Sequence, residues 1–358
     1  MNSRRNFIKA AGIGLASLQL NPQRSHAQPQ STPLLFDFWL WARPNDAESE
    51  ATLKKRYQSY KDADVRGIFF EAYSPKHFQL AKQYGLETHR WMWTMNRGEK
   101  ELLENHPEYY AVSRSGKSCA TNPPYVNYYR FLCPSHPDVP KYLEEKAREQ
   151  LEKEDVDGLH LDYIRYPDVV LPINLWPNYK LDQSTELADY DFCYSKFSKE
   201  AFFRETGIDI DKVDRPDQSP SWRSFRYRQI NKVVNRICEA AKDYRKPVTA
   251  AVFPTPDLAR RIVRQDWTNW NLSGVFPMIY HGFYKEPIQW IGTAVAEGVQ
   301  GLHGKFPLYA GLYLPDFRSL DELKEGIILA KENGAAGISL FGENDFDQQT
   351  ITLLQSIR

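Results

Sequence analysis

Short apolar stretches alternate with charged, helix-patterned stretches along most of the chain. The apolar stretches are rich in β-branched and aromatic residues, and several show the period of two that is typical of a β-strand. We expect eight strands, at residues 34–42, 65–73, 86–95, 157–166, 247–254, 272–281, 307–315 and 335–344. Eight strands that alternate with helices predict an α/β protein whose parallel sheet closes into a (β/α)8 TIM barrel.

The segments between the strands support this interpretation. In residues 319–334, Ser319 is a predicted N-cap with Glu322 at the capping-box position, and Gly334 is a predicted stop. An open doubly wound sheet is the alternative, but no glycine-rich phosphate loop follows the first strand. Two connections are far longer than usual, at residues 96–137 after the third strand and 167–191 after the fourth. Both leave the strand ends where barrel active sites lie, so we expect them to wall a substrate site.

The fourth predicted strand contains the stretch DGLHLDYIRYP, residues 157–167. Alternate side chains of a barrel strand point inward, so Leu159 and Leu161 should face the helices and His160 and Asp162 the barrel axis. A buried aspartate paired with Arg165 or with a neighbouring tyrosine is the structural alternative. A buried carboxylate is uncommon without a reason, and Asp162 lies near the C-terminal end of the strand. We therefore interpret it as an active-site residue.

The same test finds further inward polar or aromatic groups on other strands. A structural role as a hydrogen-bond partner or core residue is the alternative for each of them. As a set they predict a barrel mouth lined with carboxylates, imidazoles and flat rings. The candidate substrate-binding residues are Asp37, Trp39, His89, Trp91, Trp93, Asn96, His160, Arg165, Tyr280, His281 and Tyr313.

This combination suits a carbohydrate, because sugar rings offer C–H faces to aromatic rings and hydroxyls to polar side chains. Glycosidic cleavage needs two carboxyl groups, of which one gives a proton and the other acts as nucleophile or base. The candidate catalytic residues are Asp162 with Glu343 or Glu71. Apolar surroundings would raise the pKa of a glutamate and suit it to the acid role. The composition, with 14% aromatic residues, agrees.

Two other functions remain open. A metal-dependent hydrolase such as a carbohydrate deacetylase could use His89, His160, His281, Asp162 and Asp37 around zinc, although no HxH or HExxH spacing is present. The other is a glycan-binding barrel without turnover. For the favoured function we expect no metal and no cofactor.

The N-terminus predicts export. A twin arginine in SRRNFIK, residues 3–9, precedes a short apolar run, and SHA at residues 25–27 is a small-residue cleavage site. This pattern resembles a twin-arginine signal peptide over residues 1–27, and the apolar run is too short to span a bilayer. We expect a single barrel domain over residues 28–358 in the periplasm or outside the cell, with no membrane span.

Charge and cysteine content limit which classes of partner and metal site are expected. Without the signal the chain has 42 basic and 46 acidic residues, a net charge of −4, which argues against nucleic acid. The four cysteines have no CxxC spacing, so a zinc knuckle is not expected. Cys119 and Cys133 could pair after export, and the sequence leaves this open, as it does the oligomeric state.

The DGLHLDYIRYP stretch resembles the signature of the glycosyl hydrolase-like family 10, a group of exported bacterial barrels. HRWMWTMN, residues 89–96, is similar to the third strand of that family. The resemblance implies a (β/α)8 fold and hydrolysis of a glycan, and some members are thought to cut peptidoglycan strands. By analogy with barrel glycosidases, it implies that Asp162 is the nucleophile or the transition-state stabiliser.

The same stretch is also similar to the DxxDxDxE motif of family-18 chitinases, but it departs from that motif at the proton donor. Asp157 and Asp162 match two of its acids, whereas Ile164 stands at the position of the glutamate. The end of the seventh strand, where retaining barrel enzymes of the largest clan have a glutamate, offers only Asp316. The sequence therefore leaves the general acid unassigned.

Overall fold

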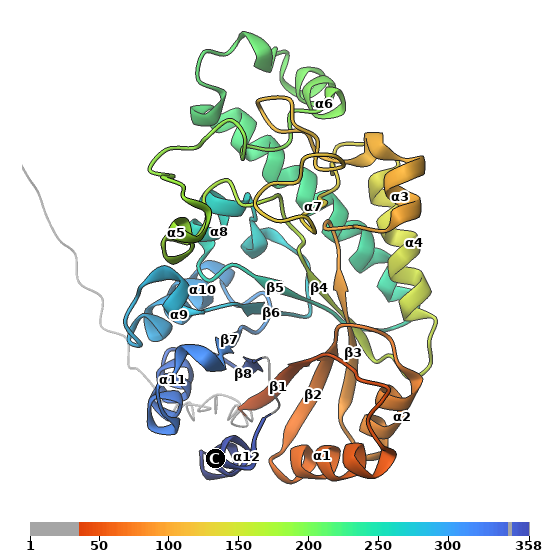
Figure 1. Cartoon of the computed structure of the whole chain (residues 1–358), viewed down its shortest axis with the longest axis vertical. Coiled ribbons are helices and arrows are strands. Elements are labelled where there is room, and N and C mark those ends of the chain that lie inside the picture. Colours follow the sequence, from red (N-terminus) through yellow and green to blue (C-terminus); the bar gives the residue numbers. More distant parts are fainter. Residues whose placement is uncertain (1–35, 343–345, 358) are drawn as a thin grey trace, which may run out of the picture. The chain divides into compact units, whose positions relative to one another are not determined.

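Eight short parallel strands alternate with helices in the computed structural model, which describes residues 36–342 and 346–357. Hydrogen bonding orders them β6-β5-β4-β3-β2-β1-β8-β7. Parallel bridges from Val275 to Leu308 and from Met278 to Gly311 join β6 to β7. The predicted (β/α)8 barrel is confirmed (Figure 1). The strands are β1 (Asp37–Ala42), β2 (Val65–Phe70), β3 (Glu87–Trp93), β4 (Gly158–Asp162), β5 (Val248–Val252), β6 (Gly274–Pro277), β7 (Tyr309–Tyr313) and β8 (Gly337–Phe341).

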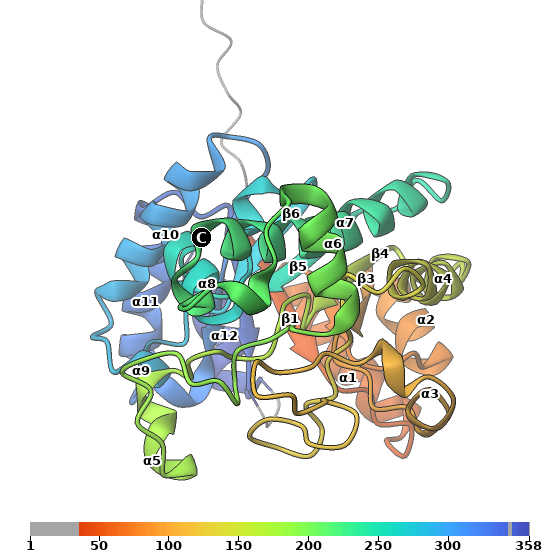
Figure 2. The ribbon, with the colours of Figure 1, turned by 90° about the horizontal axis from the view of Figure 1, so that it is seen from above.

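Helices lie around the strands (Figure 2). Several begin at a serine whose hydroxyl accepts a backbone N–H of the first turn, which satisfies an otherwise unpaired donor. In α11 that serine is Ser319 and the donor is Glu322 N, as the sequence predicts. The helices are α1 (Glu50–Asp62), α2 (Pro75–Gln83), α3 (Lys100–Asn105), α4 (Val139–Leu151), α5 (Trp176–Tyr179), α6 (Lys196–Thr206), α7 (Pro220–Lys242), α8 (Pro256–Val263), α9 (His281–Tyr284), α10 (Trp290–Leu302), α11 (Leu320–Glu332) and α12 (Gln348–Ser356).

The strands separate two layers of apolar side chains. Outward residues such as Leu159 and Leu161 pack under the helices in the larger core. Inward residues form a mainly aromatic layer, in which Trp39 stacks on Phe69 with ring centroids 4.8 Å apart. Branched aliphatic residues usually fill the interior of a barrel. In this protein large aromatic rings take their place. The expected inward and outward faces of the fourth strand are confirmed.

The two long connections follow β3 and β4, as predicted. Figure 1 shows them with α6 above these strands. They pair with each other, since Arg114 N donates to Asp191 O at 2.8 Å, and Ser113 forms a bridge with Phe192, the next residue. In the second connection, Asp191 forms a fully buried ion pair with Arg226 of α7 at 2.5 Å. These contacts fix both connections relative to the barrel.

All strands except β1 end earlier than expected. The fourth was expected to reach residue 166, but β4 ends at Asp162. The cause is local: Asp162 Oδ1 accepts the N–H of Tyr163 at 2.6 Å, and Tyr163 has a left-handed φ of 48°. An aspartate that bonds a neighbouring backbone N–H favours a turn over a continued strand.

Some sequence predictions concern parts of the chain beyond this description. The predicted signal peptide and the expected start of the domain at residue 28 lie outside the described residues, and so do Glu343 and Asn344. Within the described ranges, no helix is long and apolar enough to cross a membrane. The four cysteines are free thiols, so Cys119 and Cys133 are not paired in this structure.

Candidate active site at the barrel mouth

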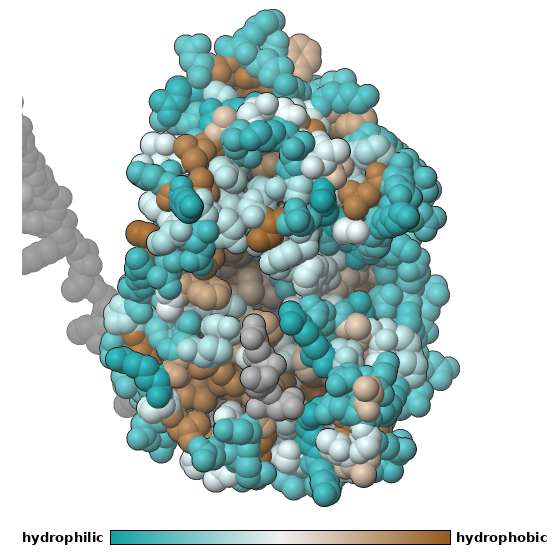
Figure 3. Space-filling view, in the orientation of Figure 1, coloured by the Kyte–Doolittle hydropathy of each residue, from teal (hydrophilic) through white to brown (hydrophobic). Residues whose placement is uncertain are grey.

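A cavity of about 220 Å³ lies at the C-terminal ends of the strands, where active sites of TIM barrels are found. Side chains from the ends of β1, β3, β4, β5, β6 and β8 line it, together with the loop after β4 and helix α9. Figure 3 shows a hollow near the middle of this face with hydrophobic side chains at its floor. Most lining residues are aromatic or aliphatic, and four are charged: Arg43, Asp162, Arg165 and Asp168.

Asp162 is the carboxylate at the floor of this cavity. Its Oδ2 accepts the indole N–H of Trp91 at 2.9 Å, and its Oδ1 accepts the backbone N–H of Tyr163 at 2.6 Å. Burial raises the pKa of Asp162, whereas these two hydrogen bonds and the charge of Arg165 oppose that rise. Two donors aimed at one carboxylate fix its orientation and favour its ionised form.

The turn after β4 brings the next residues to the cavity wall. Arg165 Nη1 donates to Asp168 Oδ2 at 2.8 Å, and both side chains are buried. The guanidinium lies over the Phe253 ring at 4.9 Å and over the Tyr163 ring at 5.3 Å. Arg165 is therefore paired with Asp168 and not with Asp162, so the alternative in which Arg165 pairs with Asp162 is wrong. The pair neutralises itself and leaves Asp162 without a directly bound cation among the described residues.

Flat rings form the remaining wall. Trp91 and Trp93 of β3 line the cavity beside Tyr280, which follows β6. Burial raises the pKa of Tyr280 well above its usual range, and the charge of Asp162 adds to this effect. The hydroxyl of Tyr280 therefore stays protonated and can donate a hydrogen bond. Phe341, at the end of β8, stacks near Tyr280 with ring centroids 6.2 Å apart.

Glu71 lies beside the cavity. Its Oε2 accepts from Arg43 Nε at 2.7 Å, and Arg43 is one of the cavity-lining residues. The charge of Glu71 contributes to the raised pKa of Asp162, so the two carboxylates interact electrostatically. Proton donation by Glu71 would require its ion pair with Arg43 to open. The other candidate acid, Glu343, lies outside the described residues, two positions after Phe341.

His160 lies inside the barrel below the cavity. Its ring stacks on Phe69 at 3.8 Å, and its Nε2 accepts from Trp41 Nε1 at 2.9 Å. Its Nδ1 lies 2.9 Å from the Thr249 hydroxyl, which itself donates to Leu159 O. Nδ1 therefore carries the proton, and burial lowers the pKa of this neutral ring well below its usual range. Both nitrogens are engaged within the protein.

Three other candidates also lie away from the cavity, toward the N-terminal ends of the strands. Asp37 begins β1 and forms an ion pair with Arg66 at 2.7 Å. Trp39 is buried in the inner aromatic layer. The Nε2 atom of His89 lies 3.4 Å from Glu87 Oε2. The alternation of inward residues identified these side chains, but it does not give their height along the barrel axis.

The last three candidates lie around the mouth without lining the cavity. Asn96 is buried, and its Oδ1 accepts the backbone N–H of Arg130 at 2.8 Å. The Nδ1 atom of His281 lies 3.9 Å from Asp316 Oδ2. Tyr313 contacts the Tyr280 ring with centroids 5.3 Å apart. These residues support the loops and rings that form the wall.

The sequence interpretation missed several residues that line the cavity. Alternation with Leu159 and Leu161 would point Tyr163 outward, but the turn at this residue brings it to the cavity wall. Asp168, in the connection after β4, and Tyr284, at the end of the short helix α9, also line the cavity, and no strand periodicity marks either side chain as inward. One signal in the sequence could have identified Asp168. It lies three residues after Arg165, close behind the strand, at a spacing that allows an ion pair.

The zinc hypothesis needs its five residues to meet, and they do not. Asp37 and His89 lie low in the barrel, and both nitrogens of His160 are engaged. Within residues 36–342 and 346–357, no three His, Cys, Asp or Glu side chains gather closely enough to hold a metal ion. The described donors therefore do not fit a zinc site.

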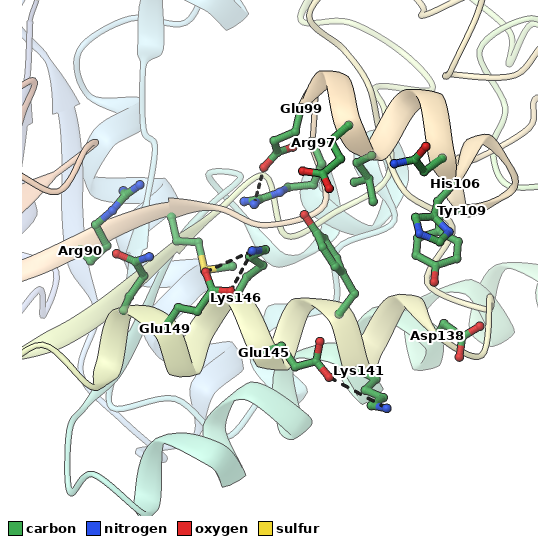
Figure 4. Close-up of a pocket in the computed structure, with 16 residues that line it drawn as sticks. Arg90, Arg97, Glu99, His106, Tyr109, Asp138, Lys141, Glu145, Lys146 and Glu149 are labelled. Atoms are coloured by element: carbon green, nitrogen blue, oxygen red, sulfur yellow. Dashed lines mark hydrogen bonds and ion pairs between the residues drawn. The ribbon is translucent and has the colours of Figure 1, made fainter.

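A second, larger hollow of about 590 Å³ lies outside the barrel between α3 and α4 (Figure 4). It is lined by charged residues of both signs, many of which pair with each other. Lys146 contacts Glu149 at 2.8 Å, and Arg97 pairs with Glu99. Because this hollow concentrates neither sign of charge, we do not place the active site there.

The fold and the mouth together define a glycosidase-like TIM barrel. Comparison with known families identifies it further: the sequence model of the family described as glycosyl hydrolase-like 10 matches residues 75–300. The chain belongs to this family, in agreement with the resemblance of its fourth strand. No curated protein matches the chain.

Solved structures of glycosidases share the fold. The catalytic domain of a β-amylase from Paenibacillus polymyxa has a TM-score of 0.58 and 12% identity, over 90% of this chain and 97% of that one. A β-galactosidase from Marinomonas ef1 has a TM-score of 0.63 and 9% identity, over 90% of this chain and 59% of that one. The chain thus spans somewhat more than half of the β-galactosidase. At these identities the likeness shows the fold alone.

Proposed function

We propose that this protein is a glycoside hydrolase that cleaves O-glycosidic bonds of an oligo- or polysaccharide. One observation carries the proposal: a buried carboxylate, Asp162, is held by two N–H donors at the floor of an aromatic cavity at the barrel mouth. Membership of a glycosyl hydrolase-like family supports it. Glycan strands of peptidoglycan are one candidate substrate, and we propose no cofactor.

Asp162 takes the role that needs an ionised carboxylate, as nucleophile or as stabiliser of the positively charged transition state. The hydrogen bonds from Trp91 and Tyr163 favour the ionised form. The proton donor is then a second carboxyl group, for which Glu343 and Glu71 remain the candidates. Tyr280, which follows β6, and the rings around it would hold the sugar from one side. Trp91 and Trp93 of β3 would also contact it.

The test is release of reducing ends by the protein without residues 1–27. The panel contains peptide-free peptidoglycan strands, chitin oligomers, and plant and algal polysaccharides. Release from one class supports the proposal and names the substrate. Binding without release from any glycan would contradict it and favour the glycan-binding barrel. The anomer of the first product, read by NMR, then distinguishes retention from inversion.

Replacing Trp91 by phenylalanine should move the acid limb of the pH–kcat/KM profile to higher pH. The acid limb falls as pH drops through the pKa of Asp162, because protonation removes the charge that the reaction uses. The variant loses the N–H bound to Asp162 Oδ2, so the ionised form is less favoured and its pKa rises further. The measurement is kcat/KM between pH 3 and 8.

Trp93→Phe is the matched control for this change. Trp93 also lines the cavity, but its indole nitrogen has no hydrogen-bond partner among the described residues. The acid limb of the Trp93→Phe variant should lie at the same pH as that of the unmodified protein, even if KM changes. An unshifted limb in the Trp91 variant would show that another group sets the limb.

We further propose export through the twin-arginine pathway, based on the N-terminal sequence. In a bacterial host, the full chain should give a mature protein that starts at Gln28 and is found in the periplasm or medium. Changing Arg4 and Arg5 together to lysine should retain the uncleaved chain in the cytoplasm. Arg24→Lys is the control, since it changes a basic residue outside the twin arginine. Export of the double variant at the normal level would refute the pathway.

A further inference from the structure

A tyrosine at the rim of the mouth is conspicuously exposed. Tyr128 lies in the long connection after β3, and 53% of it is accessible to solvent. Its ring is not in contact with solvent alone, because it lies 6.1 Å from the Trp93 ring at an interplanar angle of 44°. Trp93 lines the active-site cavity. The exposed ring is therefore an outward continuation of the cavity wall.

The rings form a continuous path. Trp93 contacts Tyr163 with centroids 4.7 Å apart, and Tyr163 also lines the cavity. Tyr129 meets the Tyr128 ring edge-on at 5.1 Å and the Tyr163 ring at 6.1 Å. Aromatic surface thus extends from the floor of the cavity to the outside of the protein.

The backbone beneath Tyr128 is fixed. Arg130 N donates to Tyr128 O at 2.9 Å and to Asn96 Oδ1 at 2.8 Å, and Tyr129 N donates to Val126 O at 3.0 Å. Arg130 Nε donates to Asn127 O at 2.8 Å. A ring on a preorganised loop binds a ligand without the entropy cost of ordering the segment.

The cavity is small for an oligosaccharide. Its volume is about 220 Å³, below the roughly 300–1,000 Å³ of pockets that enclose most of a ligand. Such a space holds little more than one sugar unit. The remaining units of a longer chain must lie outside the cavity, and the ring path gives them an apolar surface.

We propose that Tyr128, with Trp93, forms an outer subsite that stacks on the C–H face of a neighbouring sugar unit while another unit occupies the cavity. This inference rests on the proposed function and adds that the substrate is a chain longer than one unit. Loss of one aromatic contact of this kind corresponds to about a 3- to 10-fold loss in affinity.

The test is the dependence of kcat/KM on chain length. The substrates are oligosaccharides of two to six units from the cleaved glycan and the p-nitrophenyl glycoside of its single unit. Tyr128→Ala should lower kcat/KM by about 3- to 10-fold on the longest chains and leave the single-unit glycoside unchanged. Tyr128→Phe should restore the activity on long chains, because it keeps the ring. Equal effects of Tyr128→Ala at every length, or none, would overturn the subsite.

Phe203→Ala is the matched control, since Phe203 of α6 is 55% exposed and lies outside the two wall connections that follow β3 and β4. Phe203→Ala should leave kcat/KM unchanged on every substrate. If the protein hydrolyses no glycan, calorimetric titration with the longest oligosaccharide replaces the kinetics. Weaker binding by Tyr128→Ala then supports the subsite although the hydrolase proposal fails. Binding that Tyr128→Ala leaves unchanged, or no binding to any glycan, overturns the subsite.

Discussion

Asp162→Asn is expected to lower kcat/KM by about 1,000-fold or more on every glycan that the protein hydrolyses. The change removes the charge and keeps the size of the side chain. It also places an amide N–H₂ where the structure has two donors, Trp91 Nε1 and Tyr163 N, pointing at carboxylate oxygens. One of these donors then loses its acceptor. The variant therefore lacks both the charged group and its fixed orientation.

The measurement is the initial rate of reducing-end release at the pH optimum, with the fold checked by circular dichroism. Asp157→Asn is the matched control, because Asp157 immediately precedes β4 and lies at the opposite end of that strand from the cavity. There it pairs with Lys82 and accepts the N–H of Thr88 at 2.9 Å. This control should keep its activity within a few-fold. Full activity of the Asp162 variant would remove this carboxylate from the chemistry.

The fold followed from information that is local in the sequence. Short apolar stretches between helix-patterned segments predicted all eight strands, and alternation within the fourth assigned Leu161 outward and His160 inward. The start of α11 was evident from Ser319 and Glu322, since capping needs only residues three positions apart. The long connections were evident from the spacing between strands. Each of these features is set by neighbours along the chain.

The composition of the site was harder to predict, because it depends on height along the barrel axis. Inward residues lie in layers, and the stagger of neighbouring strands decides which layer reaches the mouth. Trp39 and Trp41 are two residues apart on β1, yet Trp41 lines the cavity and Trp39 is buried below it. His89 and Trp91 on β3 differ in the same way. Periodicity gives the face of a strand but not the layer.

The turn after β4 was the other feature that the pattern could not give. Residues 163–166 are mostly aromatic or aliphatic, so they were expected in the strand. A side-chain to backbone hydrogen bond at Asp162 ends the strand and takes Tyr163 into a left-handed conformation. The same aspartate thus shapes the turn and supplies the candidate catalytic carboxylate. Asp162→Asn removes the charge and so tests the catalytic role. The asparagine retains an oxygen that can accept the Tyr163 N–H and so can keep the turn.

His160→Phe is expected to lower the free energy of unfolding by about 2–4 kcal/mol at pH 7. Phenylalanine can keep the stacking on Phe69, but it cannot accept from Trp41 Nε1 or donate to the Thr249 hydroxyl. Buried donors that lose their partners carry the full cost of desolvation. Urea denaturation followed by tryptophan fluorescence measures the change.

The pH dependence of the free energy of unfolding distinguishes the hydrogen-bonding role of neutral His160 from simple packing of its ring. Burial lowers the pKa of His160 well below its usual value of 6.5, so the unfolded chain binds a proton at this site before the folded chain does. The stabilisation from neutral His160 is therefore present above pH 6.5 and is lost as pH falls toward the lower pKa of the folded state. Its contribution to the slope approaches about 1.4 kcal/mol per pH unit.

The phenylalanine variant has no such proton, so the stability difference between the two proteins should narrow from pH 7 to pH 5. His106→Gln is the control, because it removes a histidine whose side chain is 48% exposed and lies outside the barrel interior. A difference that stays constant with pH would mean that His160 takes up its proton equally in the folded and unfolded chains. That result would contradict a neutral ring held by Trp41 and Thr249 inside the barrel, and would reopen His160 as a group that titrates at the site.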